Sequence, residues 1–261
     1  MDAKKGRKNF GELVSIMEHL RSPHGCPWDR AQTMESLRTY LVEEVYEVIE
    51  AVESGDSEAL KEELGDLLFH IVFISRIAKE EGQFDIWEVI DRISKKMVSR
   101  HPHVFGNTKV SSPREVEKNW SDLKDKEKSH RESVLDGIPK HLPALLRAYR
   151  ITERASRVGF DWQRAEEIFN KLSEEIQELK QAISQGHGKK IEDEVGDVLF
   201  VLVNMARLTG NNPEEALRKT TQKFIERFHY IEKVLEKSQR SLKEASLEEM
   251  DELWEQAKGQ E

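Results

Sequence analysis

The chain has 261 residues, of which 37 % are hydrophobic and 35 % are charged, and its formal net charge is −9. This acidic balance argues against direct binding of nucleic acid, which needs a basic face. The single cysteine, Cys26, excludes an intrachain disulfide and a cysteine-based zinc site. We expect a cytoplasmic protein with no membrane partner, because no apolar signal segment follows the N-terminus and no stretch approaches the ~20 apolar residues of a bilayer span.

Apolar residues recur at helical spacing throughout the chain, and no run alternates cleanly with a period of two. The pattern predicts an all-α protein made of small helical bundles. In the first half we expect four helices: one capped by Asn9, one that begins at Thr33 or Ser36, one capped by Ser57, and one over residues 86–100.

A change of composition divides the chain. Residues 113–130 are almost entirely charged after a good helix start at Pro113, and Pro139 and Pro143 mark a boundary. We therefore predict two tandem helical-bundle domains, residues 1–112 and 136–261, joined by a charged connector helix over 113–135. The second half repeats the plan of the first, with helices over about 144–157 and 214–238 and a last helix that starts in a capping box of Ser246 and Glu249.

Two helical patterns flank the turn at residues 186–188, and both carry acids. Acids three and four residues apart share a helix face, where like charges destabilise the helix by ~0.2–0.5 kcal/mol per pair. The same pattern occurs in the first half, and one constant offset relates every acid of the first set to its counterpart in the second. The two sets are Glu174, Glu175, Glu178, Glu194 and Asp197, and Glu43, Glu44, Glu47, Glu63 and Asp66.

A short turn predicts that the two helices of each pair lie antiparallel, which brings their acidic faces together. Converging carboxylates with almost no His or Cys nearby favour a hard cation, Mg²⁺ with Mn²⁺ as a substitute, over zinc or copper. Gly65 and Gly196 lie inside these helices, where Gly costs ~1 kcal/mol relative to Ala, and we predict that another backbone approaches them closely. An ordinary solvated acidic face is the plainer interpretation, but two clusters of identical spacing, each leading into an apolar run, favour the cation site.

A metal held by carboxylates suits phosphate chemistry, and a phosphate ligand should bring cations. Candidates on or near the second pair of helices are Lys171, Lys189, Lys190, Lys223 and Arg227. Trp254 could stack on a base, with Lys258 one turn later, although its spacing fits a core or interface role at least as well. The first half has a basic pair, Lys96 and Arg100, but no evident partner of the Trp254 helix, so we predict the main nucleotide site in the second half.

The pattern Glu-Glu-x-x-Glu, a spacer, then Glu-x-x-Asp resembles the MazG nucleoside triphosphate pyrophosphohydrolases of the all-α NTP pyrophosphatase superfamily. The resemblance covers nearly the whole chain and includes the segments CPWD at 26–29, HPHVFG at 101–106 and GFDW at 159–162. It implies a tandem-domain enzyme that hydrolyses an NTP or dNTP to NMP and pyrophosphate with Mg²⁺. It further implies a house-cleaning role in the nucleotide pool and a homodimer.

The resemblance also implies roles for individual residues. The metal ligands would be Glu175, Glu178, Glu194 and Asp197, with Glu174 as a further catalytic acid that orients water. The nucleotide would be held by Lys171, Lys190, Lys223, Arg227, Trp254 and Lys258, and we add Lys189. A second metal site in the first half would use Glu44, Glu47, Glu63 and Asp66. Which carboxylate is the general base, and whether the first half is active, stay open.

Two other classes of protein fit parts of the pattern. A di-iron carboxylate bundle uses Glu-x-x-His pairs, but no His stands three residues after Glu63 or Glu194, and we expect a core or interface role for His70. A non-catalytic helical scaffold or regulatory partner is the alternative to an enzyme, with the acids serving solvation. A pyrophosphate-release assay with mixed NTPs separates the scaffold from the enzyme.

Overall fold

The computed structural model describes residues 3–113, 115–116, 119–120, 123, 133–162 and 164–259, and every regular element within them is helical. The all-α prediction is confirmed. The chain divides into two compact units, Met1–Ser129 and His130–Glu261. The connector helix predicted over 113–135 lies largely outside the described residues, so the domain limits at 112 and 136 remain a prediction. None of the described helices is both long and apolar enough to cross a bilayer.

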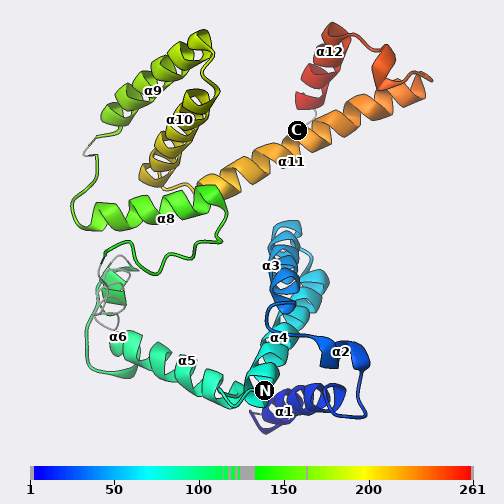
Figure 1. Cartoon of the computed structure of the whole chain (residues 1–261), viewed down its shortest axis with the longest axis vertical. Coiled ribbons are helices and arrows are strands. Elements are labelled where there is room, and N and C mark those ends of the chain that lie inside the picture. The colour runs from blue at the N-terminus through cyan, green and yellow to red at the C-terminus, as the bar shows by residue number, and fades with distance from the viewer. Residues whose placement is uncertain are drawn as a thin grey trace. The chain divides into compact units, whose positions relative to one another are not determined.

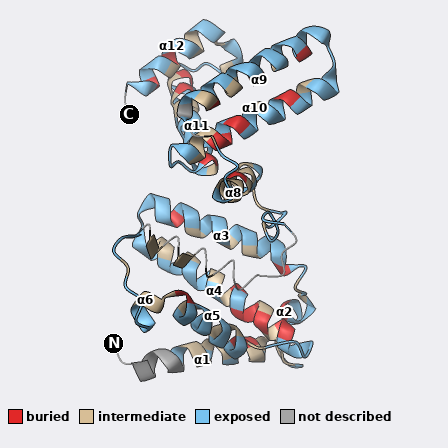
Figure 2. Cartoon of the chain, turned by 90° about the vertical axis from the view of Figure 1, so that its left-hand side faces the viewer, coloured by how far each residue is buried: buried red, intermediate tan, exposed pale blue. Residues whose placement is uncertain are grey.

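In the first unit, the long helices α3 and α4 pack side by side as an antiparallel hairpin (Figure 1). Helices α1 and α5 pack on α4 as well. The core of the unit joins α1, α3, α4 and α5 through Met17, Leu37, Val72, Phe73, Ile77 and Ile86. The second half of α4 therefore contains all of the buried residues of that helix, while most of α3 stays exposed (Figure 2). The elements are α1 (Ala3–Leu20), α2 (Pro27–Ala31), α3 (Leu37–Ser54), α4 (Ser57–Glu80), α5 (Ile86–Arg100) and α6 (Pro102–Phe105).

Two helix starts in the first unit differ from the predictions. α1 begins before Asn9, so this residue lies inside the helix. Asp56, and not Ser57, caps α4, because its carboxylate accepts hydrogen bonds from two N–H groups of the first turn at 2.9 and 3.2 Å. A carboxylate at this position also complements the positive end of the helix dipole. Gly55, at a φ of 71°, supplies the left-handed residue that ends α3 just before this cap.

In the second unit, α9 and α10 form the predicted antiparallel hairpin, which packs on α8, and α12 folds back on α11 (Figure 1). A small core lies between α11 and α12, where Ile231, Leu235 and Leu253 are buried. Ser246 caps α12 by accepting a hydrogen bond from the N–H of Glu249 at 3.3 Å, but the predicted capping box is incomplete, because the Glu249 carboxylate accepts a hydrogen bond from Arg240 at 2.8 Å. The elements are α8 (Ala144–Arg157), α9 (Ala165–Gln185), α10 (Gly188–Leu208), α11 (Pro213–Lys237), the 3₁₀ turn η1 (Leu242–Glu244) and α12 (Leu247–Lys258).

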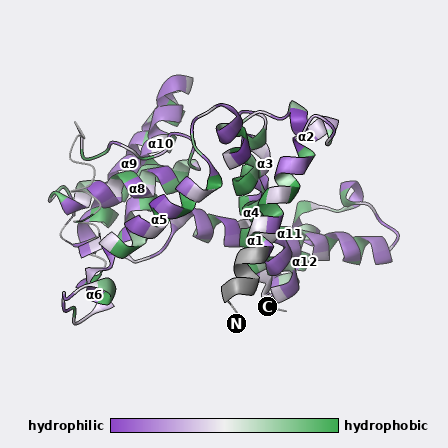
Figure 3. Cartoon of the chain, turned by 90° about the horizontal axis from the view of Figure 1, so that it is seen from below, coloured by the Kyte–Doolittle hydropathy of each residue, from purple (hydrophilic) through white to green (hydrophobic). Residues whose placement is uncertain are grey.

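Both hairpins carry exposed apolar side chains on one face of each helix, which we call the hairpin stripes. Spacings of three, four and seven residues place the members of a stripe on one helix face. The two stripes occupy corresponding positions of the repeat: Val45, Val52, Leu64, Leu68 and Ile71 in the first hairpin, and Ile176, Ile183, Val195, Leu199 and Leu202 in the second. Green hydrophobic segments mark this character on α3 and α4 (Figure 3). Each stripe lies outside the core of its own unit.

Candidate metal and nucleotide site

The acids of the second hairpin converge where α9 faces α10. One carboxylate oxygen from each of Glu175, Glu194 and Asp197 lies within 4.8 Å of the other two. Glu175 and Glu194 are buried, and Glu194 Oε2 has no hydrogen-bond partner among the described residues. A buried carboxylate oxygen without a partner is costly unless a cation reaches it. Glu178, the fourth predicted ligand, is exposed and stands outside this trio.

Electrostatics add to the evidence for a cation at this cluster. Burial raises the pKa of Glu194, and the negative charge of Glu178 raises it further. The positive charge of Lys190 lowers this pKa, while Glu175 and Asp197 raise it. Glu178 therefore acts on the site through its charge, although its oxygens lie outside the trio. Oxygen ligands that repel one another in this way fit a hard divalent cation.

The first hairpin repeats the arrangement. One oxygen from each of Glu44, Glu63 and Asp66, the counterparts of the second trio in the repeat, lies within 4.8 Å of the others. Burial raises the pKa of Glu63, and the charge of Glu47 raises it further. The pKa of Glu47 is raised by loss of hydration and by Glu44, and Glu43 adds to this repulsion. Both hairpins thus offer the donor set and the charge that suit Mg²⁺ or Mn²⁺.

The acids of the second hairpin hold one of the predicted phosphate ligands. Lys171 Nζ lies 2.9 Å from Glu174 and 2.7 Å from Glu175. The hydrogen bond to Glu175, followed by that to Glu174, raises the pKa of Lys171, so the ammonium stays charged. Lys189 and Lys190 are exposed in the first turn of α10. These three lysines therefore lie on the same two helices as the acids.

The other predicted nucleotide residues lie on α11 and α12. The guanidinium of Arg227 lies over the ring of Trp254, 5.3 Å from its centroid, and Phe224 contacts the same ring at 5.0 Å. Lys223 is exposed on α11, and Lys258 pairs with an acid of its own helix. Figure 1 shows α12 on α11 and apart from the α9–α10 hairpin. A single chain therefore does not bring Trp254 together with the acid trio.

Both hairpins match one protein family. The model of the MazG nucleotide pyrophosphohydrolase domain matches residues 32–105 and again residues 163–231. The chain belongs to the MazG family. It is 49 % identical over 251 residues to the nucleoside triphosphate pyrophosphohydrolase/pyrophosphatase MazG of Thermotoga maritima, with 96 % of each chain covered. It is 41 % identical over 254 residues to a nucleoside triphosphate pyrophosphohydrolase of Escherichia coli, with 95 % of this chain and 97 % of the relative covered.

Each MazG-family match contains one acid cluster, and neither match reaches Trp254. A crystal structure of a mazG-related protein from Thermotoga maritima is 33 % identical and covers 44 % of this chain and 98 % of its own, with a TM-score of 0.38.

The first half of this MazG-family chain contains a counterpart of Trp254 that we did not predict. The guanidinium of Arg100 lies over the ring of Trp120, 5.4 Å from its centroid, as Arg227 lies over Trp254 at 5.3 Å. The expectation that the first half lacks such a partner is therefore wrong. His101 contacts the Trp120 ring at 4.8 Å, so the first tryptophan is packed between two side chains of the helix end.

Two sequence signals could have revealed this pair. Lys96 and Lys223 each stand ten residues after the first residue of their helix, α5 and α11, so the two basic pairs share a helical register. A tryptophan followed four residues later by a lysine occurs at 120–124 and again at 254–258. Lys124 itself lies outside the described residues. The prediction that the second half is the main nucleotide site now depends on the lysines beside its acids.

The two helical glycines lie in open surroundings. A Cβ added at Gly65 or Gly196 would meet no neighbouring atom within 4 Å outside its own helix backbone. The prediction that another backbone approaches these positions within the chain is therefore wrong.

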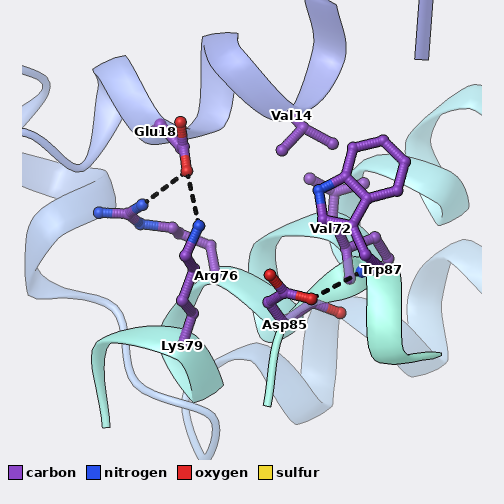
Figure 4. A pocket seen from close by; sticks show the side chains of 9 residues that line it. Val14, Glu18, Val72, Arg76, Lys79, Asp85 and Trp87 are labelled. Carbon is purple, nitrogen blue, oxygen red and sulfur yellow. Dashed lines mark hydrogen bonds and ion pairs between the residues drawn. The ribbon is translucent and has the colours of Figure 1, made fainter. Parts of the chain in front are cut away.

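A pocket in the first unit lies toward the C-terminal end of α4, past the acid cluster (Figure 4). The Glu18 carboxylate accepts hydrogen bonds from Arg76 at 3.0 Å and Lys79 at 3.2 Å. Asp85 caps α5 by accepting a hydrogen bond from the N–H of Trp87 at 2.9 Å. Because these charged groups are already engaged with one another and with the backbone, we do not include this pocket in the candidate site.

The raised pKa of Glu194 predicts that Glu194→Gln stabilises the metal-free protein. The folded state binds the Glu194 proton more tightly than the unfolded chain does, so ionisation of this group at neutral pH opposes folding. In the presence of a chelator at pH 7, we expect the variant to melt at a higher temperature than the native protein. This gain should vanish as the pH falls through the raised pKa, because native Glu194 is then protonated as well.

Scanning calorimetry at pH 7 and at lower pH measures this difference. The matched control is Glu192→Gln, which removes the same charge from an exposed position on the same helix. Added Mg²⁺ should raise the melting temperature of the native protein and of the control by more than it raises that of Glu194→Gln, which keeps only the first cluster intact. A Glu194→Gln variant that melts below the native protein at pH 7 would contradict the expectation.

Proposed function

We propose that this MazG-family chain is an Mg²⁺-dependent enzyme that hydrolyses an NTP or dNTP to NMP and pyrophosphate. The observation that carries the proposal is the convergence of Glu175, Glu194 and Asp197, with a buried and unpaired oxygen on Glu194. Two relatives of nearly the same length, which are named for the pyrophosphohydrolysis of nucleoside triphosphates, support it. A house-cleaning role in the nucleotide pool is part of the same proposal.

The second hairpin supplies the proposed metal site. The ligands would be Glu175, Glu194 and Asp197, with Glu178, which lies outside the trio in this structure, as the fourth, and Mn²⁺ could replace Mg²⁺. Such a cation, when bound, neutralises phosphate oxygens and makes water a stronger nucleophile. The hairpin contributes rigidity, because α9 and α10 pack along their length and hold acids from both helices in one place. Glu174 is exposed beside the trio, and we assign it the orientation of the attacking water.

The proposed reaction breaks the bond between the α-phosphorus and its bridging oxygen to the β-phosphate. Water adds to the α-phosphorus, a site carboxylate accepts the water proton, and pyrophosphate leaves with the bridging oxygen. Negative charge develops on that leaving group, and nearby cations stabilise it. The cations proposed for this role are Lys171, Lys189, Lys190, Lys223 and Arg227. Because one chain does not bring Trp254 together with the acid trio, Trp254 and Lys258 of a second copy would reach the base, and stacking of this kind tolerates any base.

We also propose that the protein is a homodimer in which the hairpin stripes are covered. Contiguous apolar side chains on a surface mark an interaction site. The stripe residues Ile176 and Ile183 stand seven residues apart on α9. On α10, Val195, Leu199 and Leu202 are separated by four and then three residues. Both spacings suit packing against other helices, and a second copy presents the same surface. Two hairpins would then form a four-helix bundle.

A pyrophosphate-release assay on the full-length protein tests the proposed activity. We expect each NTP or dNTP that is hydrolysed to give NMP and pyrophosphate in equal amounts with Mg²⁺. A chelator should abolish release, and Mn²⁺ should restore it. Release of orthophosphate with NDP would contradict the proposed position of cleavage. No release with any nucleotide would leave the scaffold or regulatory role.

A further inference from the structure

The two acid clusters have matching acids but different neighbours. In the second cluster, Glu175 is held by Lys171, which stands one turn earlier on the same helix, at 2.7 Å. The place of Lys171 in the repeat is taken in the first half by Tyr40, which cannot supply a positive charge. The corresponding acid in the first cluster, Glu44, therefore needs another partner.

His70 supplies that partner from the facing helix. Its Nε2 lies 3.2 Å from Glu44 Oε1, so a side chain of α4 reaches an acid of α3. His70 is 9 % exposed, and its Nδ1 is buried without a hydrogen-bond partner among the described residues. Nε2 is therefore the ring nitrogen that donates a hydrogen bond to Glu44.

Aromatic rings hold the imidazole in this orientation. Tyr40 stacks on His70 with ring centroids 6.1 Å apart and planes 9° apart. Phe69 contacts the imidazole edge-on, also at 6.1 Å. At the position of His70 the second half has Val201, which has no polar group. His70, stacked on Tyr40, therefore supports Glu44 in the first cluster. In the second cluster Lys171 supports the matching acid, Glu175.

The differences in sequence between the two halves change the charge around the acids. The second cluster has lysines at three neighbouring positions where the first half has a tyrosine, an acid and an alanine. The pairs are Lys171 with Tyr40, Lys189 with Glu58 and Lys190 with Ala59. Glu58 is paired with Lys61, and the counterpart of Lys61 is Glu192, so the charges at these positions cancel between the two halves. Without counterparts of Lys171 and Lys190, the first cluster keeps more of its negative charge, which attracts a divalent cation more strongly. In the second cluster the lysines offset part of the negative charge of the acids. A bound polyphosphate would neutralise these lysines, so the cluster would again be strongly negative.

We propose that His70 is the positioning residue of the first cluster and that this cluster binds a divalent cation without nucleotide more tightly than the second cluster does. His70 acts through Glu44, which it holds in place for the cation as Lys171 holds Glu175. This inference rests on the proposed function in one respect, that both clusters bind a divalent cation. The first half then contains a cation site that fills independently of substrate.

Mn²⁺ binding to the full-length protein, followed by the electron paramagnetic resonance signal of free Mn²⁺, tests this inference without nucleotide or activity. Glu194→Gln disables the second cluster, and Glu63→Gln disables the first. We expect the dissociation constant of the first cluster to be at least about tenfold lower than that of the second. Binding of equal strength, or tighter binding by the second cluster, would overturn the inference and leave the proposed enzyme intact. No Mn²⁺ binding at either cluster would overturn the proposed metal dependence as well.

Substitutions of His70 in the Glu194→Gln background test the positioning role. His70→Val, which copies the second half, and His70→Leu, which is larger, should each weaken Mn²⁺ binding about 10–100-fold. His70→Gln keeps a side-chain N–H donor and should bind within about threefold of the parent. Circular dichroism reports whether each variant folds. If His70→Val does not fold, His70→Leu is used as the apolar variant. Unchanged Mn²⁺ affinity in the apolar variants would overturn the positioning role of His70. A loss of affinity in His70→Gln as large as in the apolar variants would overturn it as well.

Discussion

Glu194→Gln is expected to lower kcat/KM for NTP hydrolysis by about 10²–10³-fold. Glu194 is buried, has an oxygen without a hydrogen-bond partner among the described residues, and has an oxygen within 4.8 Å of two other carboxylates, so the substitution removes both a proposed ligand and a charge from the cluster. The same change that stabilises the metal-free fold should therefore abolish most of the activity. A gain in stability together with a loss of activity identifies a group kept for function.

Two comparisons make the Glu194 experiment specific. The control Glu192→Gln removes an exposed charge from the same helix and should leave kcat/KM within about twofold, because surface substitutions away from a site have small effects. Glu63→Gln, the matching change in the first cluster, should reduce activity less than Glu194→Gln does. If Glu178→Ala and Asp197→Ala leave hydrolysis intact while Glu47→Ala abolishes it, the main site is in the first half.

Leu199→Glu is expected to raise the dissociation constant of the proposed homodimer by at least about 10²-fold. Leu199 is 45 % exposed in one chain and lies in the middle of the stripe on α10. A second copy would bury it, and a carboxylate buried there without a partner opposes association. Leu68→Glu, the matching change on the first hairpin, should act in the same direction.

Sedimentation velocity over a range of concentrations measures this effect. The control is Leu247→Glu, which places an acid at an exposed position in the first turn of α12, where a negative charge suits the helix dipole. This control should dimerise as the native protein does. A native protein that stays monomeric at all concentrations would contradict the proposal, as would a Leu199→Glu variant that dimerises normally.

Helix positions were predictable from local chemistry. The helices expected over 86–100 and 144–157 have those bounds in the structure, because periodic apolar residues and helix-ending residues act over a single turn. The exception at α4 is also local, since Asp56 and Ser57 are neighbours and both types can cap. The choice between them depends on backbone direction after Gly55, which the sequence pattern does not specify.

The partners of the acids were less predictable. Glu44 and His70 lie on different helices and meet only because α3 and α4 pack as a hairpin. We expected His70 to be a core or interface residue, which describes its burial but not its hydrogen bond to an acid. The pairing of Arg100 with Trp120 was hidden in the same way, because the tryptophan follows two helix ends and an irregular segment.

The sequence alone determined the acidic pattern and its repeat in both halves at one constant offset. It also determined the helical spacing that puts each set of acids on one face. Spacing along one helix fixes which side chains share a face, so these features need no packing information. The tertiary structure decided which acids meet, since Glu178 stays outside the trio of Glu175, Glu194 and Asp197. It also decided that His70 of α4 supports Glu44 of α3, because contacts between helices depend on how those helices pack, whereas Lys171 and Glu175 pair within a single turn of α9.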